Sequence, residues 1–364
     1  MFGKKMPSPA VFAVGDEYQI MVPVARRSLM WAKVNGKDYF DDSNGIIRSL
    51  EKIHRICVPA KELDKAGEYT ICERKIIWRK PYFPLLKPET QTTFKFRPVK
   101  AENPRAYHIS DTHNQVESPV KAAKAFGEMD FLILNGDIPN HSGHPRYFRT
   151  IYEICSQITH GNIPVVFARG NHDLRGLYAE KIADYTPNLN GKTYYTFRLG
   201  SIWGIVLDCG EDKPDDHEEY GGTVCCHFFR EKQTAFLENV VKNAENEYLA
   251  EGVTHRLVIC HNPFSFRIQP PFDVEDELFT YWSKLLKENV RPDVMICGHT
   301  HKFDISEQGS KFDHRGQPCT MVIGTEKKDD YFACAGFEFG KDSIDVYRAD
   351  SNGKNEKVYT IRMQ

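Results

Sequence analysis

The sequence predicts an α/β fold preceded by a small all-β domain, and three observations support this prediction. Residues 11–100 carry short alternating runs and no long helical pattern, which is typical of a β-sandwich. After residue 105, apolar β-branched runs alternate with amphipathic helical stretches, which indicates an α/β domain. Five prolines within residues 80–104 indicate an extended linker. We therefore expect a β-sandwich domain at 1–100, a linker to about 104 and a larger domain at 105–364.

The individual elements follow from the same patterns. In the first region we expect a hairpin turn at Asn35-Gly36 and strands at 18–24, 29–34, 54–58, 69–76 and 92–96. In the second region the apolar runs predict strands at 107–110, 131–135, 164–168, 202–207, 256–260, 294–297 and 321–323. Amphipathic segments predict helices at about 120–128, 147–159, 231–247 and 277–288. The tail is expected to close the fold as a hairpin of strands at 344–347 and 357–362.

Composition and charge narrow the class of protein. The 364 residues include 41% hydrophobic residues, and 48 Lys and Arg balance 50 Asp and Glu, as in an ordinary globular protein. The net charge of −2 makes nucleic acid an unlikely partner, because such binders usually carry a basic excess. No apolar run reaches the roughly 18 residues of a membrane span, and no signal-peptide core is present. We expect no membrane partner, a cytoplasmic location and ten reduced cysteines.

Polar side chains with metal-binding or catalytic chemistry follow the ends of five predicted strands. These clusters are Asp111-Thr112-His113, Gly136-Asp137, Gly170-Asn171-His172-Asp173, His261 and Gly298-His299-Thr300-His301. Ligands of open α/β sheets bind just beyond the carboxyl ends of the strands. Residues from five strands can therefore meet at one site, although they are far apart in the sequence.

The donor chemistry of these clusters predicts a pair of metal ions. The donors are carboxylate, amide and imidazole groups without a thiolate, which suits Mn, Fe, Co, Ni or Zn better than calcium. Seven donors exceed the needs of one four-coordinate ion, so we expect two divalent ions that share a bridging carboxylate. Two such ions, two Asp and one hydroxide leave a net charge of +1, which suits an anionic substrate. The donors are Asp111, His113, Asp137, Asn171, His261, His299 and His301.

The ordered motifs resemble those of the calcineurin-like metallophosphoesterase superfamily over roughly residues 105–347. The resemblance implies a four-layer α/β/β/α sandwich with a dinuclear metal centre at one edge. It implies that His172 is catalytic and that Asp137 bridges the two ions. It assigns the remaining ligands to a first ion, held by Asp111, His113 and His301, and to a second ion, held by Asn171, His261 and His299. The N-terminal region resembles the fibronectin-type-III-like domain that precedes the catalytic domain in some purple acid phosphatases.

Two positions, 140 and 113, depart from the patterns of relatives. Some relatives have an Asp three positions after the bridging Asp, where it orients the catalytic histidine, and purple acid phosphatases have a Tyr there. This chain has Asn140 at that position, and His113 where purple acid phosphatases have Gly. The tyrosinate that stabilises their ferric ion is therefore absent, and a hydrogen-bonding role for His172 is favoured over that of a fully tuned acid.

These features predict hydrolysis of a small phosphomonoester or phosphodiester by a metal-bridging hydroxide. A non-catalytic scaffold on the same fold is one alternative, and a nuclease is a less favoured one because segment 210–229 is acidic. That segment is long enough to act as a lid. Candidate substrate contacts are Arg146, Arg175, Arg267, His141, His144 and a wall at 268–272.

Overall fold

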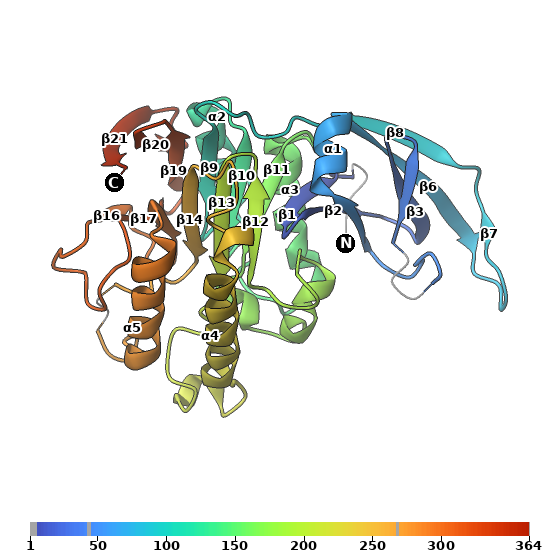
Figure 1. Cartoon of the computed structure of the whole chain (residues 1–364). Helices are drawn as coiled ribbons and strands as arrows, with labels where there is room; N and C mark the ends of the chain where they lie inside the picture. Colours follow the sequence, from blue (N-terminus) through green and yellow to red (C-terminus); the bar gives the residue numbers. More distant parts are fainter. Residues whose placement is uncertain (1–5, 42–44, 267–268, 364) are drawn as a thin grey trace.

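Two large β-sheets packed face to face form the centre of the molecule (Figure 1). The computed structural model describes residues 6–41, 45–266 and 269–363. Within these residues the larger sheet has ten strands. Nine of them follow the order β21 (Asn355–Arg362), β20 (Ser343–Asp350), β19 (Tyr331–Phe339), β9 (Arg105–Ile109), β10 (Phe131–Asn135), β11 (Pro164–Ala168), β1 (Ala10–Val14), β2 (Glu17–Pro23) and β5 (Ile53–Pro59). The tenth strand, β18 (Thr325–Lys328), pairs with β19. The second sheet has six strands in the order β12 (Tyr195–Leu199), β13 (Ile202–Leu207), β14 (His255–Cys260), β15 (Val294–Cys297), β17 (Met321–Ile323) and β16 (Asp304–Ser306).

Helices cover the outer face of each sheet. Helices α2 (Glu117–Phe126) and α3 (Arg149–Ile158) share a buried cluster with β9, β10 and β11. Helices α4 (Cys226–Lys242) and α5 (Asp276–Leu285) share another with β13, β14 and β15. Strands such as β10 and β14 are apolar on both faces because each lies between a helical layer and the opposite sheet. The predicted four-layer α/β/β/α sandwich is therefore confirmed.

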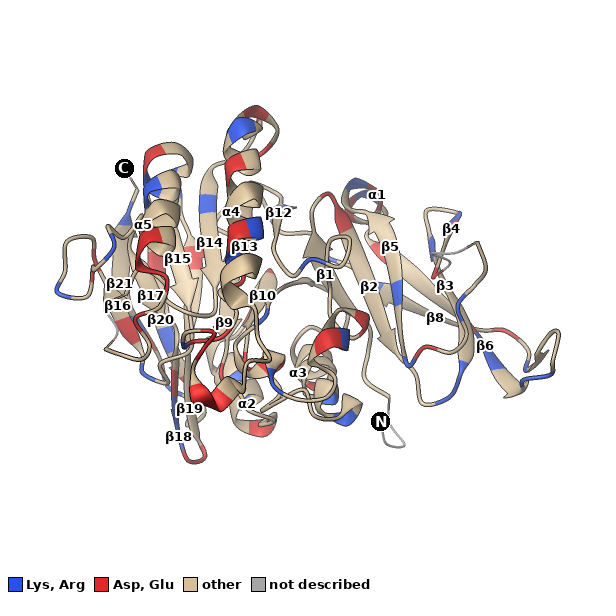
Figure 2. Cartoon of the chain, turned by 90° about the horizontal axis from the view of Figure 1, so that it is seen from below, with Lys and Arg blue, Asp and Glu red and all other residues tan. Residues whose placement is uncertain are grey.

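The N-terminal region forms a β-sandwich that shares the larger sheet. One of its layers consists of β1, β2 and β5, and β1 runs parallel to β11 with Phe12 opposite Val165. The other layer is a five-stranded sheet of β4 (Lys37–Phe40), β3 (Ser28–Val34), β6 (Glu68–Trp78), β7 (Leu85–Leu86) and β8 (Thr90–Lys95). Met30 and Ile71 of this layer pack in one buried cluster with Val22 and Ile56. Hydrogen bonds of the larger sheet thus cross the boundary near residue 104, and Figure 2 shows β1 and β2 of this layer side by side.

The secondary structure agrees with the sequence prediction for every predicted strand and helix, with ends that shift by at most five residues. The sequence prediction missed helix α1 (Ala60–Ala66), whose seven residues are too few for a periodic signal. It also missed β19, which contains Gly336, a residue that weakens a strand pattern. That glycine is needed because a Cβ there would overlap the ring of Phe126. In the described part of the chain, no helix combines the length and apolarity needed to cross a membrane.

Candidate metal centre

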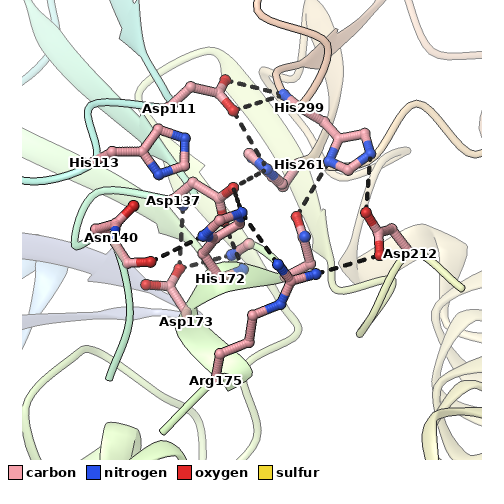
Figure 3. Close-up of polar contacts among 12 residues, drawn as sticks. Asp111, His113, Asp137, Asn140, His172, Asp173, Arg175, Asp212, His261 and His299 are labelled. Carbon is pink, nitrogen blue, oxygen red and sulfur yellow. Dashed lines mark hydrogen bonds and ion pairs between the residues drawn. The ribbon is translucent and has the colours of Figure 1, made fainter. Parts of the chain in front are cut away.

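The carboxyl ends of strands from both central sheets bring the predicted donors together. Asp111 and Asp137 follow β9 and β10, and Asn171 follows β11 in the same sheet. His261 and His299 follow β14 and β15 in the opposite sheet. Figure 3 shows the side chains of Asp111, Asp137 and His172 gathered with those of His261 and His299.

One group of donors consists of Asp111, His113 and His301, whose ligand atoms lie within 4.8 Å of one another. His301 Nε2 is 3.3 Å from Asp111 Oδ1. His113 Nε2 is 3.1 Å from His301 Nε2. Three donor atoms from two distant segments therefore converge as a single ion would require.

A second group consists of Asp111, Asp137 and His261, and all three residues are buried. His261 Nε2 lies 3.2 Å from Asp137 Oδ2 and 3.7 Å from Asp111 Oδ1. Beside this group, His299 Nδ1 lies 3.1 Å from Asn171 Oδ1. The structure thus gathers all seven predicted donors, and their division between two ions stays a prediction.

His172 lies at the same site. Its ring Nε2 is 4.0 Å from Asp137 Oδ2, and its backbone N–H donates to Asp137 Oδ1 at 2.9 Å. Its Nδ1 is 2.9 Å from the backbone oxygen of Asn140. A carbonyl oxygen can only accept, so Nδ1 carries the proton. His172 also shares a 4.8 Å donor group with His113 and Asp137, so its catalytic role stays a prediction.

The backbone of the site is strained in a way that few residues tolerate. Five predicted ligands lie in the left-handed region: Asp111 (φ 56°), His113 (φ 45°), Asp137 (φ 54°), His299 (φ 74°) and His301 (φ 56°). Each such non-glycine residue costs about 1–3 kcal/mol and persists where the surroundings hold it. Backbone bonds supply part of that restraint, since Asp111 N–H donates to Gly136 O and His113 N–H donates to Asp137 O. Such strain is concentrated at functional sites.

Glycines in the motifs make room for the ligands. A Cβ at Gly170 would overlap Asp137, and a Cβ at Gly298 would overlap Ser110 and Asp111. These contacts come from the opposite loop rather than from the glycine's own turn. Gly170 and Gly298 are therefore required by the close approach of neighbouring strand ends.

The electrostatics of the site favour a cation. Asp111 and Asp137 are 0% and 2% exposed, and two buried carboxylates so close together need positive charge between them. Burial alone would lower the pKa of His261, but Asp137 and Asp111 outweigh it and raise that pKa to about 10. By contrast, burial lowers the pKa of His113 and of His299 to about 4. These two imidazoles are neutral at pH 7, the state that binds metal ions.

Buried imidazole nitrogens without a hydrogen-bond partner also indicate that the site binds a cation. Among the described residues, His261 Nε2 and His113 Nδ1 are buried without a hydrogen-bond partner. His261 Nδ1 is engaged by the backbone oxygen of Asn135 at 2.6 Å, which leaves Nε2 to face the two carboxylates. Imidazole nitrogens oriented in this way by a carbonyl are typical metal ligands. The donor set therefore fits divalent cations.

Comparison with known proteins identifies the family. The model of the family described as calcineurin-like phosphoesterase matches residues 104–303. The chain belongs to this family. No curated protein matches the chain in a sequence search.

A search of solved structures finds proteins that are similar to this phosphoesterase. Purple acid phosphatase PPD1 from yellow lupin (Lupinus luteus) is 12% identical, and the match covers 98% of this chain and 74% of that chain with a TM-score of 0.61. The match therefore includes the N-terminal β-sandwich of this phosphoesterase. Vacuolar Protein Sorting 29 from Cryptosporidium parvum is 11% identical, covers 72% of this chain and 100% of that chain, and has a TM-score of 0.37.

Three side chains besides the seven predicted donors and His172 contact the site of this phosphoesterase. Ser110 Oγ donates to Asp111 Oδ2 at 2.6 Å. Asp173 Oδ2 accepts from Gly170 N–H at 2.8 Å, and burial together with Asp137 raises the pKa of Asp173 to about 7. Asp212 Oδ2 lies 3.9 Å from His299 Nε2. The sequence prediction missed Asp212 because an Asp in an acidic loop is usually exposed, and only the fold brings it to His299.

The residues predicted to contact the substrate differ in where the structure places them. Arg175 Nη1 lies 3.3 Å from His172 Nε2, and its guanidinium donates two bonds to Glu211 at 2.9 and 2.8 Å. Arg146 donates to Tyr147 within its own loop, and His141 and His144 accept from nearby backbone N–H groups. Arg267 and Ile268 lie outside the described residues. Phe272 of the predicted wall lines a small cavity with Asp212 and His299.

Proposed function

We propose that this phosphoesterase hydrolyses a small phosphomonoester or phosphodiester at a centre of two divalent metal ions (Mn, Fe, Zn, Ni or Co). The observation that carries the proposal is the set of overlapping donor groups around Asp111, Asp137 and His113. Asp111, His113 and His301 would hold one ion, Asp137 would bridge, and Asn171, His261 and His299 would hold the other. When bound, the ions would supply Lewis acidity and lower the pKa of a coordinated water toward neutrality.

Residues of the chain itself would position the phosphoryl group. His172 and Arg175 lie side by side at the edge of the donor set, and both carry N–H groups. In the structure Arg175 donates to His172 Nε2, so that nitrogen is the acceptor and the ring is neutral. If Arg175 instead donates its hydrogen bond to a phosphoryl oxygen of the substrate, His172 Nε2 no longer accepts from Arg175. Nε2 would then take up a proton from solvent and donate it to the leaving-group oxygen, a contribution of about 10²–10⁴-fold in general acid catalysis.

The acidic lid favours a small substrate over a nucleic acid. Glu211 and Asp212 of segment 210–229 are buried beside Arg175, and Asp215, Asp216 and Glu218 follow them. Negative charge at the mouth of the site repels a long polyanion, whereas a small phosphoester meets mainly the cationic centre. A cytoplasmic location is part of the proposal, since all ten cysteines are free thiols.

The test is turnover of p-nitrophenyl phosphate and bis-p-nitrophenyl phosphate by protein loaded with each of the five metals, with metal content measured in parallel. We expect about two ions per chain and hydrolysis of at least one of the two esters. Asp137→Asn should lose both metal and turnover, whereas Asp342→Asn, at an exposed turn, should retain both. Fully metallated protein that hydrolyses neither ester would favour the non-catalytic scaffold.

A further inference from the structure

A hairpin at the N-terminal end projects from the molecule with apolar side chains exposed. Strand β6 continues past the sandwich, and β7 returns along it with Trp78 opposite Leu85 (Figure 1). Five of the fourteen exposed large hydrophobic side chains in the described residues fall in this one segment. They are Ile77 (57% exposed), Trp78 (61%), Tyr82 (87%), Phe83 (82%) and Leu85 (45%). Exposed apolar side chains gathered in this way usually indicate a binding surface.

The same hairpin is strongly basic. Residues 74–87 contain five Lys and Arg and no Asp or Glu, although the chain as a whole balances 48 against 50. At the base, Arg74 pairs with Glu89 and Lys75 pairs with Glu73. Arg79 and Lys80 near the tip, and Lys87 opposite Lys75 at the base, are exposed and form no ion pair with a described residue. Their charge therefore lies beside the exposed apolar residues of the hairpin, and Figure 2 shows blue segments in the hairpin beyond β6.

We propose that this hairpin binds the surface of an anionic lipid bilayer, with the aromatic side chains of the tip inserted and the basic side chains on the headgroups. Trp and Tyr are enriched at the level of the headgroups because one end of each ring is apolar and the other polar. Lys and Arg next to them gain from the negative potential of acidic lipids. Lys80 also lies 5.6 Å from the centre of the Trp78 ring, so cation and aromatic group occupy the same end of the hairpin.

The shape of the surface favours a bilayer over a protein partner. A protein partner usually offers a complementary face of about 800 Å² per side, which suits a broad patch. Here the apolar residues lie on a narrow projecting hairpin, and a soft bilayer surface can accept them without a matching pocket. The inference revises the expectation that the protein has no membrane partner. It is independent of the proposed hydrolysis, because the hairpin lies at one end of the molecule, away from β10 and β14, which precede donors of the proposed metal centre (Figure 1).

Vesicle sedimentation tests the proposal on the full chain. We expect binding to phosphatidylcholine vesicles that contain 30% phosphatidylserine, little binding to pure phosphatidylcholine, and weakening by salt. Each cation near the membrane contributes about fivefold in affinity, so Arg79→Glu/Lys80→Glu should weaken binding at least 25-fold. The matched control is Lys232→Glu/Lys287→Glu, which changes the net charge equally at exposed sites on the catalytic region and should change binding less than threefold. Equal loss in both double variants would overturn the proposal.

Tryptophan fluorescence locates the contact. The chain has four Trp, of which Trp31, Trp203 and Trp282 are at most 5% exposed, so a spectral change on vesicle addition must come from Trp78. We expect a shift to shorter wavelength with anionic vesicles, absent in Trp78→Phe although that variant still sediments. The triple variant Trp78→Ala/Tyr82→Ala/Phe83→Ala should lose binding at an unchanged unfolding temperature. An unshifted spectrum of the wild type would overturn the proposal. So would a wild-type protein that binds no lipid but forms a dimer, if the triple variant is a monomer.

Discussion

At the scale of single residues, hydrogen bonds settle what the sequence left open about His172. The sequence predicts the residue but places Asn140 where some relatives have an orienting Asp. The structure shows that the backbone oxygen of Asn140 accepts from Nδ1 instead, so no carboxylate is needed to set the tautomer. A backbone contact of this kind leaves no trace in the sequence. The donor residues themselves were predictable because each follows a strand end in a short motif.

We predict that His172→Ala retains its metal ions and loses turnover. The side chain contributes no donor to the proposed ligand set, while its Nε2 faces Arg175 at the edge of the site. Removal of a general acid typically lowers the rate by about 10²–10⁴-fold. Metal content and kcat are measured together, with His160→Ala, at an exposed turn, as the matched control. Unchanged kcat at full metal content would exclude His172 from the chemistry.

A second prediction at this scale concerns Asp212. Its carboxylate lies 3.9 Å from His299 Nε2 on the far side of the ring from Asn171, which suits a group that orients a metal-ligating imidazole. Mutation of such a partner typically weakens metal affinity by about 10–100-fold. Asp212→Asn should therefore release one ion more readily in competition with a chelator. Asp216→Asn, also in the lid but exposed, should leave the chelator titration unchanged, and equal affinities in all three proteins would contradict the role of Asp212.

At the scale of elements, continuous apolar runs within the α/β region were predictable, whereas β1, β12 and β19 were missed. β10, β11, β13, β15 and β17 have the predicted ends because each is a continuous apolar run between two layers. Strand β19 depends on tertiary packing, since a Cβ at its Gly336 would overlap the ring of Phe126. Likewise, Gly170 and Gly298 were recognised as parts of motifs. The side chains that leave no room for a Cβ at these positions lie in loops that are distant in the sequence.

The loop after β15 provides a test of this steric cause. Gly298→Ala would bring a methyl group against Ser110 and Asp111, and the substitution should destabilise the fold by about 2–3 kcal/mol, as in other overpacked sites. Gly309→Ala has a positive φ of 72° but open space, so it should cost only about 1 kcal/mol. Urea unfolding measures both, and metal content should fall only in Gly298→Ala. Equal costs for the two variants would show that the close approach of Ser110 and Asp111 does not require Gly298.

At the scale of the whole molecule, one continuous sheet joins the two regions that the sequence patterns distinguish. The change of pattern near residue 104 predicts two domains, and the predicted all-β and α/β regions are both present. However, β1 lies between β11 and β2 in one continuous sheet, so the N-terminal strands complete the sheet that carries Asp111 and Asp137. Periodicity reports which residues are buried, but it does not report which distant strand covers them.

This continuity leads to a prediction about Phe12, a β1 residue that is 0% exposed and packs edge-on against Phe167 at 6.2 Å. Phe12 belongs to the same buried cluster as Ile151 and Cys155 of α3, so its removal opens a cavity in the core of the catalytic region. Phe12→Ala should lower the free energy of unfolding by about 3–5 kcal/mol. Phe228→Ala, whose ring is 64% exposed, should change it by less than about 0.5 kcal/mol.

The unfolding profile shows whether the N-terminal strands and the α/β region unfold together or separately. Because β1 and β11 exchange ladder hydrogen bonds, we expect one cooperative transition in which β-sheet signal and metal release coincide, and Phe12→Ala should move both together. Deletion of residues 1–104 should leave β11 as an unpaired, apolar edge and yield aggregated protein without turnover. A soluble, metal-loaded fragment of residues 105–364 with full turnover would show instead that the sheet closes at β11 without its N-terminal strands.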